Sequence, residues 1–133
     1  MKELNIRNMV FASTFLEDVH QPFHLIIDFA DLVEAYNNLL YINVPEQFEE
    51  SRESESRMKS FLKRCPRGTC SINVFNADTP EKGILQFAED RGMDLIALVT
   101  HGRKGIKGLF TSSLTEKLVN HSALPVLSVN IEI

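Results

Sequence analysis

The sequence predicts an α/β fold in which a five-stranded parallel sheet carries helices on both faces. Apolar runs of strand length alternate along the chain with segments of helical periodicity. Two of the runs, 9–12 and 95–99, are apolar at every position, as expected for strands buried between two layers of helices. Alternation at this spacing implies right-handed βαβ crossovers and therefore parallel strands.

The first strand and the first helix are predicted from the amino-terminal third of the chain. Residues 4–13 form the strand, which we expect to be central because its last residues are continuously apolar. Residues 16–36 have helical spacing, with the regular helix beginning near Gln21 because Pro22 fits only a first turn. The asparagines at 37–38 are expected to end the helix. Its apolar stripe consists of Val19, Phe23, Ile26, Ile27, Ala30 and Val33.

The middle of the chain continues the alternation. Residues 39–44 form the second strand, and residues 46–63 form a helix whose acidic residues come early and whose basic residues come late, which complements the helix dipole. Residues 71–75 alternate between apolar and polar, which predicts a strand at the edge of the sheet. The next helix begins at 78–80, where a capping side chain precedes a proline, and ends at Gly92. Its buried stripe is Ile84, Phe87 and Ala88.

The last third combines a strand, a basic loop and a helix. The strand at 95–99 is followed by a loop that contains Arg103, Lys104 and Lys107 and no acidic residue. Ser113 and Glu116 have capping-box spacing and predict a helix over 113–121, after which 126–131 forms the last strand. Because a helix start carries free N–H groups and partial positive charge, this arrangement suits an anion. The alternative is a solvated loop before an ordinarily capped helix.

The carboxyl-terminal half of the chain resembles the universal stress protein family. That family carries Gly-x2-Gly-x9-Gly-Ser/Thr between its fourth strand and last helix, and the matching positions here are Val99, Gly102, Ser112 and Ser113. Thr-His-Gly-Arg at 100–103 and the tail HSALPVLSV are also typical of the family. The resemblance covers nearly the whole chain. It implies one domain over 1–133, a Rossmann-like, adenine nucleotide α-hydrolase-like fold, and the strand order 3-2-1-4-5.

The resemblance also implies a nucleotide site at the carboxyl ends of the first and fourth strands, for ATP with Mg²⁺. Gly102 would let the backbone approach a phosphate, Ser112 and Ser113 would donate to phosphates, and Ile42 lies where the family uses a backbone group against adenine. The complete set of implied positions is Ala12, Ser13, Thr14, Ile42, Val99, Gly102, Arg103, Ser112, Ser113 and Leu114.

Three of these positions depart from the family pattern. Val99 replaces a glycine, so a branched side chain either meets the ligand or points into the core. Ser112 replaces another glycine, which removes backbone freedom and adds a donor. Thr14 replaces the aspartate that contacts the adenosine part of the ligand, and a charge-assisted hydrogen bond of that kind contributes about 1.5 to 3 kcal/mol.

The departures leave several functions open. The leading hypothesis is a homodimeric, cytoplasmic stress-response module that pairs through 125–131 and has a degenerate site binding nucleotide weakly or not at all. The alternative is an ATP- or AMP-binding sensor, and a third hypothesis is a slow nucleotide hydrolase. We assign no catalytic residue, because nothing resembles a nucleophile elbow and Ser113 is expected to cap the helix.

Composition excludes other classes of partner. A net charge of −4 argues against a nucleic-acid surface, and the most apolar stretch, 25–33, is interrupted by two aspartates and does not span a membrane. No targeting segment is expected. His20 and His24 are four residues apart, but no third ligand accompanies them, so we predict no metal site. Cys65 and Cys70 are predicted to be reduced thiols, with a short disulfide loop as the alternative.

Overall fold

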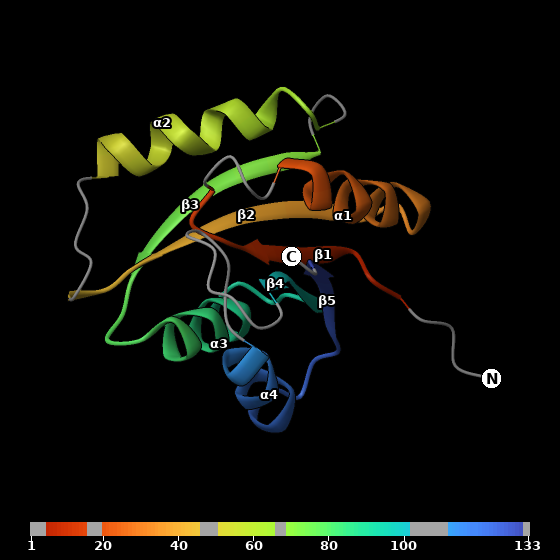
Figure 1. The fold of residues 1–133 in the computed structure, drawn as a ribbon. Coiled ribbons are helices and arrows are strands. Elements are labelled where there is room, and N and C mark those ends of the chain that lie inside the picture. The colour runs from red at the N-terminus through yellow and green to blue at the C-terminus, as the bar shows by residue number, and fades with distance from the viewer. Residues whose placement is uncertain (1–4, 16–19, 46–50, 66–68, 102–111, 132–133) are drawn as a thin grey trace.

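The predicted α/β architecture is confirmed by a computed structural model, which describes residues 5–15, 20–45, 51–65, 69–101 and 112–131. Strands and helices alternate throughout (Figure 1). The elements are β1 (Asn8–Ala12), α1 (His20–Leu32), β2 (Tyr36–Asn43), α2 (Ser51–Leu62), β3 (Cys70–Asn76), α3 (Pro80–Asp90), β4 (Leu95–His101), α4 (Ser112–His121) and β5 (Val126–Ile131).

The sheet has the order β3-β2-β1-β4-β5, as the resemblance implied, and every pairing is parallel. Val10 of β1 lies between Asn38 of β2 and Ile96 of β4. The strand order reverses between β1 and β4, because the chain first builds outward through β2 and β3 and then crosses to the other side. β3 lies at one edge of the sheet, as its alternating sequence predicted.

Two hydrophobic cores fill the space on either side of the sheet. Helices α1 and α2 cover one face and α3 and α4 cover the other (Figure 1). The first core contains a cluster of aromatic rings, in which Phe23 packs 5.0 Å from Phe11 and 5.1 Å from Phe61, measured between ring centroids. The second core is aliphatic apart from Phe87 and the ring of Phe75 beside it. Within the described part of the chain, no helix is long and apolar enough to cross a membrane.

The first strand and first helix are both shorter than predicted. β1 begins at Asn8, and Ile6 is buried outside it. α1 ends at Leu32, so the prediction that the helix reaches 36 and ends at the asparagines is wrong. The N–H of Glu34 donates to Asp31 O at 3.2 Å and that of Ala35 donates to Ala30 O at 2.8 Å. This pair of bonds is a Schellman ending, and it frees 37–38 to enter β2.

Glu34 occupies the position of that ending where a left-handed backbone is needed, with φ of 57°. The equivalent residue after α3 is Gly92, with φ of 64°, and Met93 there donates to Ala88 O at 2.9 Å. An L side chain is disfavoured in this conformation. We therefore expect Glu34→Gly to raise the free energy of unfolding by about 0.5 to 1 kcal/mol, measured by urea titration. Glu34→Ala is the control: it removes the same carboxylate and keeps the Cβ, so an equal gain there would contradict the backbone explanation.

The two carboxyl-terminal helices start differently from one another. Thr79 caps α3, its Oγ1 accepting the N–H of Lys82 at 3.2 Å, and Pro80 follows in the first turn, as predicted. α4 runs over Ser112–His121, so the predicted helix over 113–121 is found with its start one residue earlier, and Ser113 lies inside the first turn and not at the predicted capping position. A sequence pattern locates a helix start only to within a residue or two, because several early positions can present a suitable side chain.

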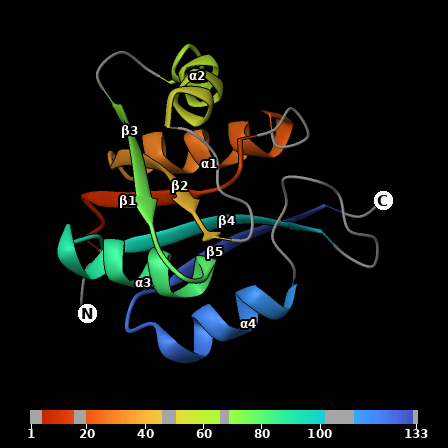
Figure 2. The same ribbon diagram turned by 90° about the vertical axis from the view of Figure 1, so that its left-hand side faces the viewer.

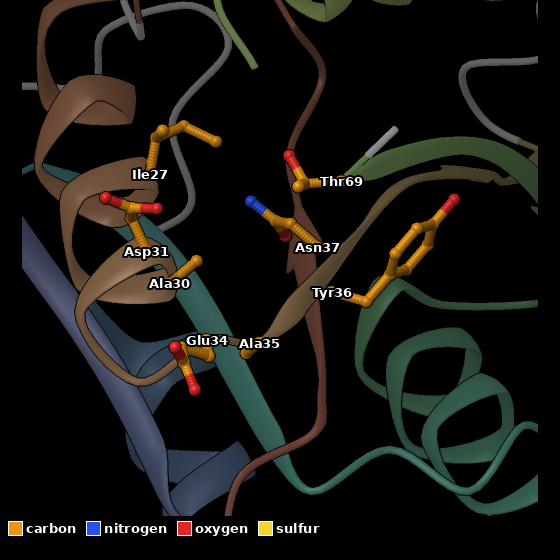
Figure 3. Close-up of a pocket in the computed structure, with 8 residues that line it drawn as sticks. All are labelled: Ile27, Ala30, Asp31, Glu34, Ala35, Tyr36, Asn37 and Thr69. Carbon is orange, nitrogen blue, oxygen red and sulfur yellow. The ribbon is translucent and has the colours of Figure 1, made fainter. Parts of the chain in front are cut away.

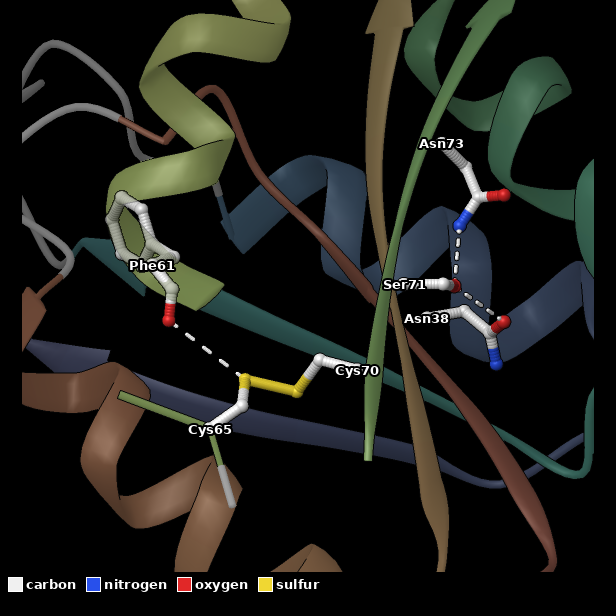
Figure 4. Close-up of a disulfide and its surroundings, with 6 residues drawn as sticks. All are labelled: Asn38, Phe61, Cys65, Cys70, Ser71 and Asn73. Atoms are coloured by element: carbon white, nitrogen blue, oxygen red, sulfur yellow. Dashed lines mark hydrogen bonds between the residues drawn. A yellow bond between two sulfur atoms is a disulfide. The ribbon is translucent and has the colours of Figure 1, made fainter. Parts of the chain in front are cut away.

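Cys65 and Cys70 form a disulfide, which corrects the prediction of two reduced thiols (Figure 4). The chain leaves α2, turns, and enters β3 at Cys70, which brings the two Cα atoms to 6.2 Å. That separation lies within the range that a disulfide spans. The spacing of the cysteines in the sequence could not show this, because the approach depends on how α2 and β3 meet.

Candidate functional site

At the carboxyl edge of the sheet, β1 stops short of both neighbours at the point where the strand order reverses, and we call this position the notch. β1 ends at Ala12, opposite Leu40 of β2 and Leu98 of β4, while β2 runs on to Asn43 and β4 runs on to His101. β2 and β4 therefore extend past the end of β1, and beyond Ala12 the sides of these strands that face one another are not paired with β1. In open α/β sheets, ligands bind at this crevice beyond the strand ends.

The floor of the notch is the turn that follows β1. The N–H of Ser13 donates to Leu40 O at 3.1 Å, and Ser13 Oγ accepts the N–H of Phe15 at 3.0 Å. Phe15 has φ of 59°, a left-handed conformation that the buried ring maintains by packing against Phe11 and Phe61. The position of Thr14 is thereby set by contacts on both sides.

Thr14 is the residue of this turn that has spare hydrogen-bonding capacity. Its Oγ1 is buried and has no hydrogen-bond partner among the described residues. Its carbonyl oxygen accepts Arg57 Nε at 3.1 Å, and the guanidinium of Arg57 lies 5.6 Å from the centre of the Tyr41 ring. The structure thus brings a cation from α2 beside the end of β1, a residue that the sequence analysis missed.

The β2 side of the notch ends in Ile42 and Asn43. The Ile42 side chain is buried in the core on the α3 side, against Gly83, so this residue faces the notch with its backbone. Asn43 is 5% exposed, and its Nδ2 donates to Asn76 Oδ1 at 3.2 Å. Asn43 was also missed, although a polar residue directly after an apolar strand run was a signal for it.

The β4 side is formed by Val99 and Thr100. Val99 is 2% exposed and belongs to the aromatic core on the α1 and α2 face, so its branched side chain points into the core. Ala12 is likewise fully buried, in the opposite core. Thr100 is 4% exposed. Buried polar side chains therefore lie at or next to the ends of three strands, namely Ser13 after β1, Asn43 at the end of β2 and Thr100 one residue before the end of β4.

The amino end of α4 lies at the same edge as the ends of β4 and β5 (Figure 2). Ser112 begins this helix, Ser113 is exposed in its first turn, and Leu114 packs partly into the α3-side core. The free N–H groups of a helix start are aimed away from the helix and suit an anion. Gly102 and Arg103, together with the other cations of the predicted basic loop, lie outside the described residues.

The chemistry that this edge offers is hydrogen bonding and electrostatics. It presents backbone groups from two strands, small polar side chains and a helix start, which are the means by which proteins hold phosphate and sugar groups. No group of three His, Cys, Asp or Glu side chains among the described residues is arranged to hold a metal ion.

Comparison with protein families finds a match between residues 37–130 and the model of the universal stress protein family. Universal stress protein MJ0577 of Methanocaldococcus jannaschii is 28% identical over 111 residues, which cover 80% of this chain. The matched region spans 65% of the length of that relative.

Solved structures share the fold at low sequence identity. The structure of MJ0577 superposes with a TM-score of 0.73 at 23% identity, covering 97% of this chain and 99% of that one. A universal stress protein in complex with cAMP gives 0.65 at 12% identity, with 95% and 98% covered. The universal stress protein from Archaeoglobus fulgidus in complex with dAMP gives 0.63 at 14% identity, also with 95% and 98% covered.

Proposed function

Because the chain belongs to the universal stress protein family, we propose that it is a cytoplasmic stress-response module that binds an adenine nucleotide weakly in the notch beyond β1. The observation that carries the proposal is the shortness of β1 between two longer neighbours at the point where the strand order reverses. Two universal stress proteins of the same fold were solved in complex with cAMP and dAMP. Their ligands indicate an adenine nucleotide as the class to test.

The departures from the family pattern do not all weaken such a site. Val99 points into the core, so its side chain is directed away from the crevice. Ile42 presents backbone and not side chain, which is compatible with a contact to adenine. Thr14 is the substitution with a clear cost, because a hydroxyl stands where the family has a carboxylate. We propose Ser112, Ser113 and Leu114 as the phosphate-facing helix start, together with Gly102 and Arg103 of the preceding loop.

The test is a calorimetric titration of dialysed protein with AMP, with cAMP and with ATP plus Mg²⁺. We expect saturable binding with a dissociation constant of about 0.1 to 1 mM, which is on the order of −4 to −5.5 kcal/mol. Gly102→Val, which leaves the described sheet untouched, is expected to abolish the heat while the circular dichroism spectrum stays unchanged. Absence of saturation with all three nucleotides at concentrations well above these values would overturn the proposal.

We also propose a homodimer that forms through β5. β5 is one of the two edge strands of the described sheet, at the opposite side from β3. Ile96 N–H donates to Pro125 O at 3.1 Å, and its register partner is Val126. In a parallel pair of strands, when one residue directs its N–H and C=O toward the neighbouring strand, its register partner directs its own N–H and C=O away from that strand. The backbone groups of Val126 and Ser128 therefore point away from β4, toward the open edge of the sheet. Such an edge pairs readily with a second copy.

Ser128→Pro tests the dimer without breaking the β4 ladder. Proline removes an N–H that faces outward, a position where edge strands tolerate it. We expect the wild-type chain to sediment as a dimer at micromolar concentration and the Ser128→Pro variant as a monomer with the same thermal unfolding profile to within a few degrees. Ser128→Ala is the matched control and should remain dimeric. A wild-type monomer at that concentration would exclude this interface.

A further inference from the structure

A pocket lies at the opposite edge of the sheet from the notch. It opens where α1 ends and where β2 and β3 begin, and its volume is about 340 Å³ (Figure 3). Because all the strands are parallel, their amino ends form this edge and their carboxyl ends form the other. The pocket is therefore separate from the proposed nucleotide site. Its volume lies at the lower end of the range of about 300 to 1,000 Å³ that small-molecule sites occupy.

The amide of Asn37 at the start of β2 has no partner in the described structure. The residue is 1% exposed, and neither Nδ2 nor Oδ1 makes a hydrogen bond to any described residue. Figure 3 shows the amide projecting from β2 across the pocket toward Ile27 and Asp31 of α1. The backbone is separately engaged, since Asn37 N–H donates to Thr69 O at 2.8 Å. A buried amide destabilises the fold when neither its N–H donors nor its oxygen has a hydrogen-bond partner. We therefore expect a partner that the described residues do not supply.

Other amides of the same sheet are paired, which makes Asn37 unusual. Asn38 Nδ2 donates to Met9 O at 3.1 Å, and its Oδ1 accepts from Ser71 Oγ at 3.0 Å. Asn73 Nδ2 donates to Leu39 O at 3.1 Å and to Ser71 Oγ at 3.0 Å (Figure 4). These asparagines hold neighbouring strands together, whereas the Asn37 side chain faces the pocket.

The charge around the pocket is negative. Asp31 and Glu34 line it, and both carboxylates are exposed. The carboxyl end of α1 lies here, where a helix carries partial negative charge. The walls between the carboxylates and the amide are apolar and consist of Ile27, Ala30 and Ala35. The pocket thus offers acidic groups, an apolar middle and an amide with an unused donor and acceptor.

We propose that this pocket binds a short aliphatic amino alcohol. Its ammonium group lies between Asp31 and Glu34, its methylene chain packs on the apolar wall, and its hydroxyl bonds to Asn37. A hydroxyl both donates and accepts, so one group satisfies both Oδ1 and Nδ2. The amide atoms are almost inaccessible to solvent, so the proposed binding includes a rotamer change of Ile27, because the other two wall residues are alanines.

The ligand class is tested by NMR titration of the ¹⁵N-labelled protein with aminobutanol at low ionic strength. We expect saturable shifts of the Asn37 side-chain NH₂ pair and of the Ala30 and Ala35 amides. Butylamine lacks the hydroxyl and should bind at least about tenfold more weakly, as expected for loss of a hydrogen bond to a buried group. Butanediol lacks the charge and should bind about three- to tenfold more weakly, as expected for loss of two exposed ion pairs. Absence of a saturable shift at Asn37, or equal shifts with butanediol, would overturn the proposal.

Variants separate a binding role from a structural one. Asn37→Leu should weaken aminobutanol binding by about tenfold or more and raise the melting temperature, because it removes an unpaired amide. The control Asn73→Leu removes a paired amide, so it should lower the melting temperature and leave binding unchanged. If Asn37→Leu lowers the melting temperature and aminobutanol does not bind, an ordered water is the partner of the amide and the proposal fails.

The acidic groups are tested in the same titration. Asp31→Asn combined with Glu34→Gln should weaken binding by about three- to tenfold, as two exposed ion pairs permit. Asp28→Asn is the matched control on the same helix, since Asp28 is exposed and does not line the pocket. Equal weakening by Asp28→Asn would show that general charge, and not this pocket, attracts the amine, which contradicts the proposal.

Discussion

Thr14→Asp is expected to increase the affinity for AMP by about ten- to hundredfold. The carboxylate adds a charge-assisted hydrogen bond to a ribose hydroxyl or to the adenine amine, which contributes about 1.5 to 3 kcal/mol. The scaffold for that group already exists, because Ser13 bonds to β2 and the carbonyl of Thr14 is held by Arg57. Calorimetric titration of the variant and of the wild-type chain measures the difference.

Two control variants isolate the charge. Asparagine has the shape of aspartate without its charge, so Thr14→Asn should increase the affinity for AMP no more than a few-fold. Thr14→Val removes the hydroxyl, whose Oγ1 is buried without a described partner, and should bind AMP no better than the wild type. An equal gain from asparagine and aspartate would refute the electrostatic explanation.

Arg57 competes with the nucleotide for a carboxylate introduced at position 14. Its Nε lies 3.1 Å from the Thr14 carbonyl oxygen, so a carboxylate at position 14 is within reach of the same guanidinium. An intramolecular ion pair would consume part of the gain in affinity. We therefore expect Thr14→Asp combined with Arg57→Gln to bind AMP more tightly than Thr14→Asp alone. The reverse order would contradict competition by Arg57 and would show that its guanidinium contacts the nucleotide.

The sheet was predictable because its signals are local and strong. The apolar runs at β1 and β4 marked central strands, and Pro80 after Thr79 marked the start of α3. The strand order came from the resemblance and not from the periodicity of any one segment. The edge position of β3 followed from its alternation alone.

The errors arise where the decisive contact leaves no signal in the periodicity or composition of the sequence. Asn37 resembles a helix stop, yet α1 ends earlier through the left-handed Glu34, and the asparagine becomes the first buried residue of β2. Cys65 and Cys70 meet only because α2 and β3 converge. Arg57 reaches the end of β1 from a helix that reads as a solvated cover of the sheet.

Gly83→Ala is expected to lower the free energy of unfolding by about 2 to 3 kcal/mol, although alanine is the better helix former. Gly83 lies in the first turn of α3, facing β2. A Cβ added there would lie 2.7 Å from Ile42 Cγ2, 2.8 Å from Ile42 Cδ1 and 3.0 Å from Ala77 Cβ. Those distances are too short for carbon atoms, so the buried Ile42 side chain, α3 or β2 has to shift. Urea denaturation of the variant gives the measurement.

A double-mutant cycle attributes that cost to Ile42. Ile42→Ala removes both close atoms, so Gly83→Ala should be nearly neutral in that background, with a coupling energy of about 2 kcal/mol. Ile42→Val removes Cδ1 and keeps Cγ2, so it should restore only part of the stability that Gly83→Ala removes. Gly83→Ala should also weaken AMP binding, because displacement of Ile42 shifts the backbone that borders the notch. A variant that loses stability and keeps its full affinity would show that the β2 side of the notch does not contact the nucleotide.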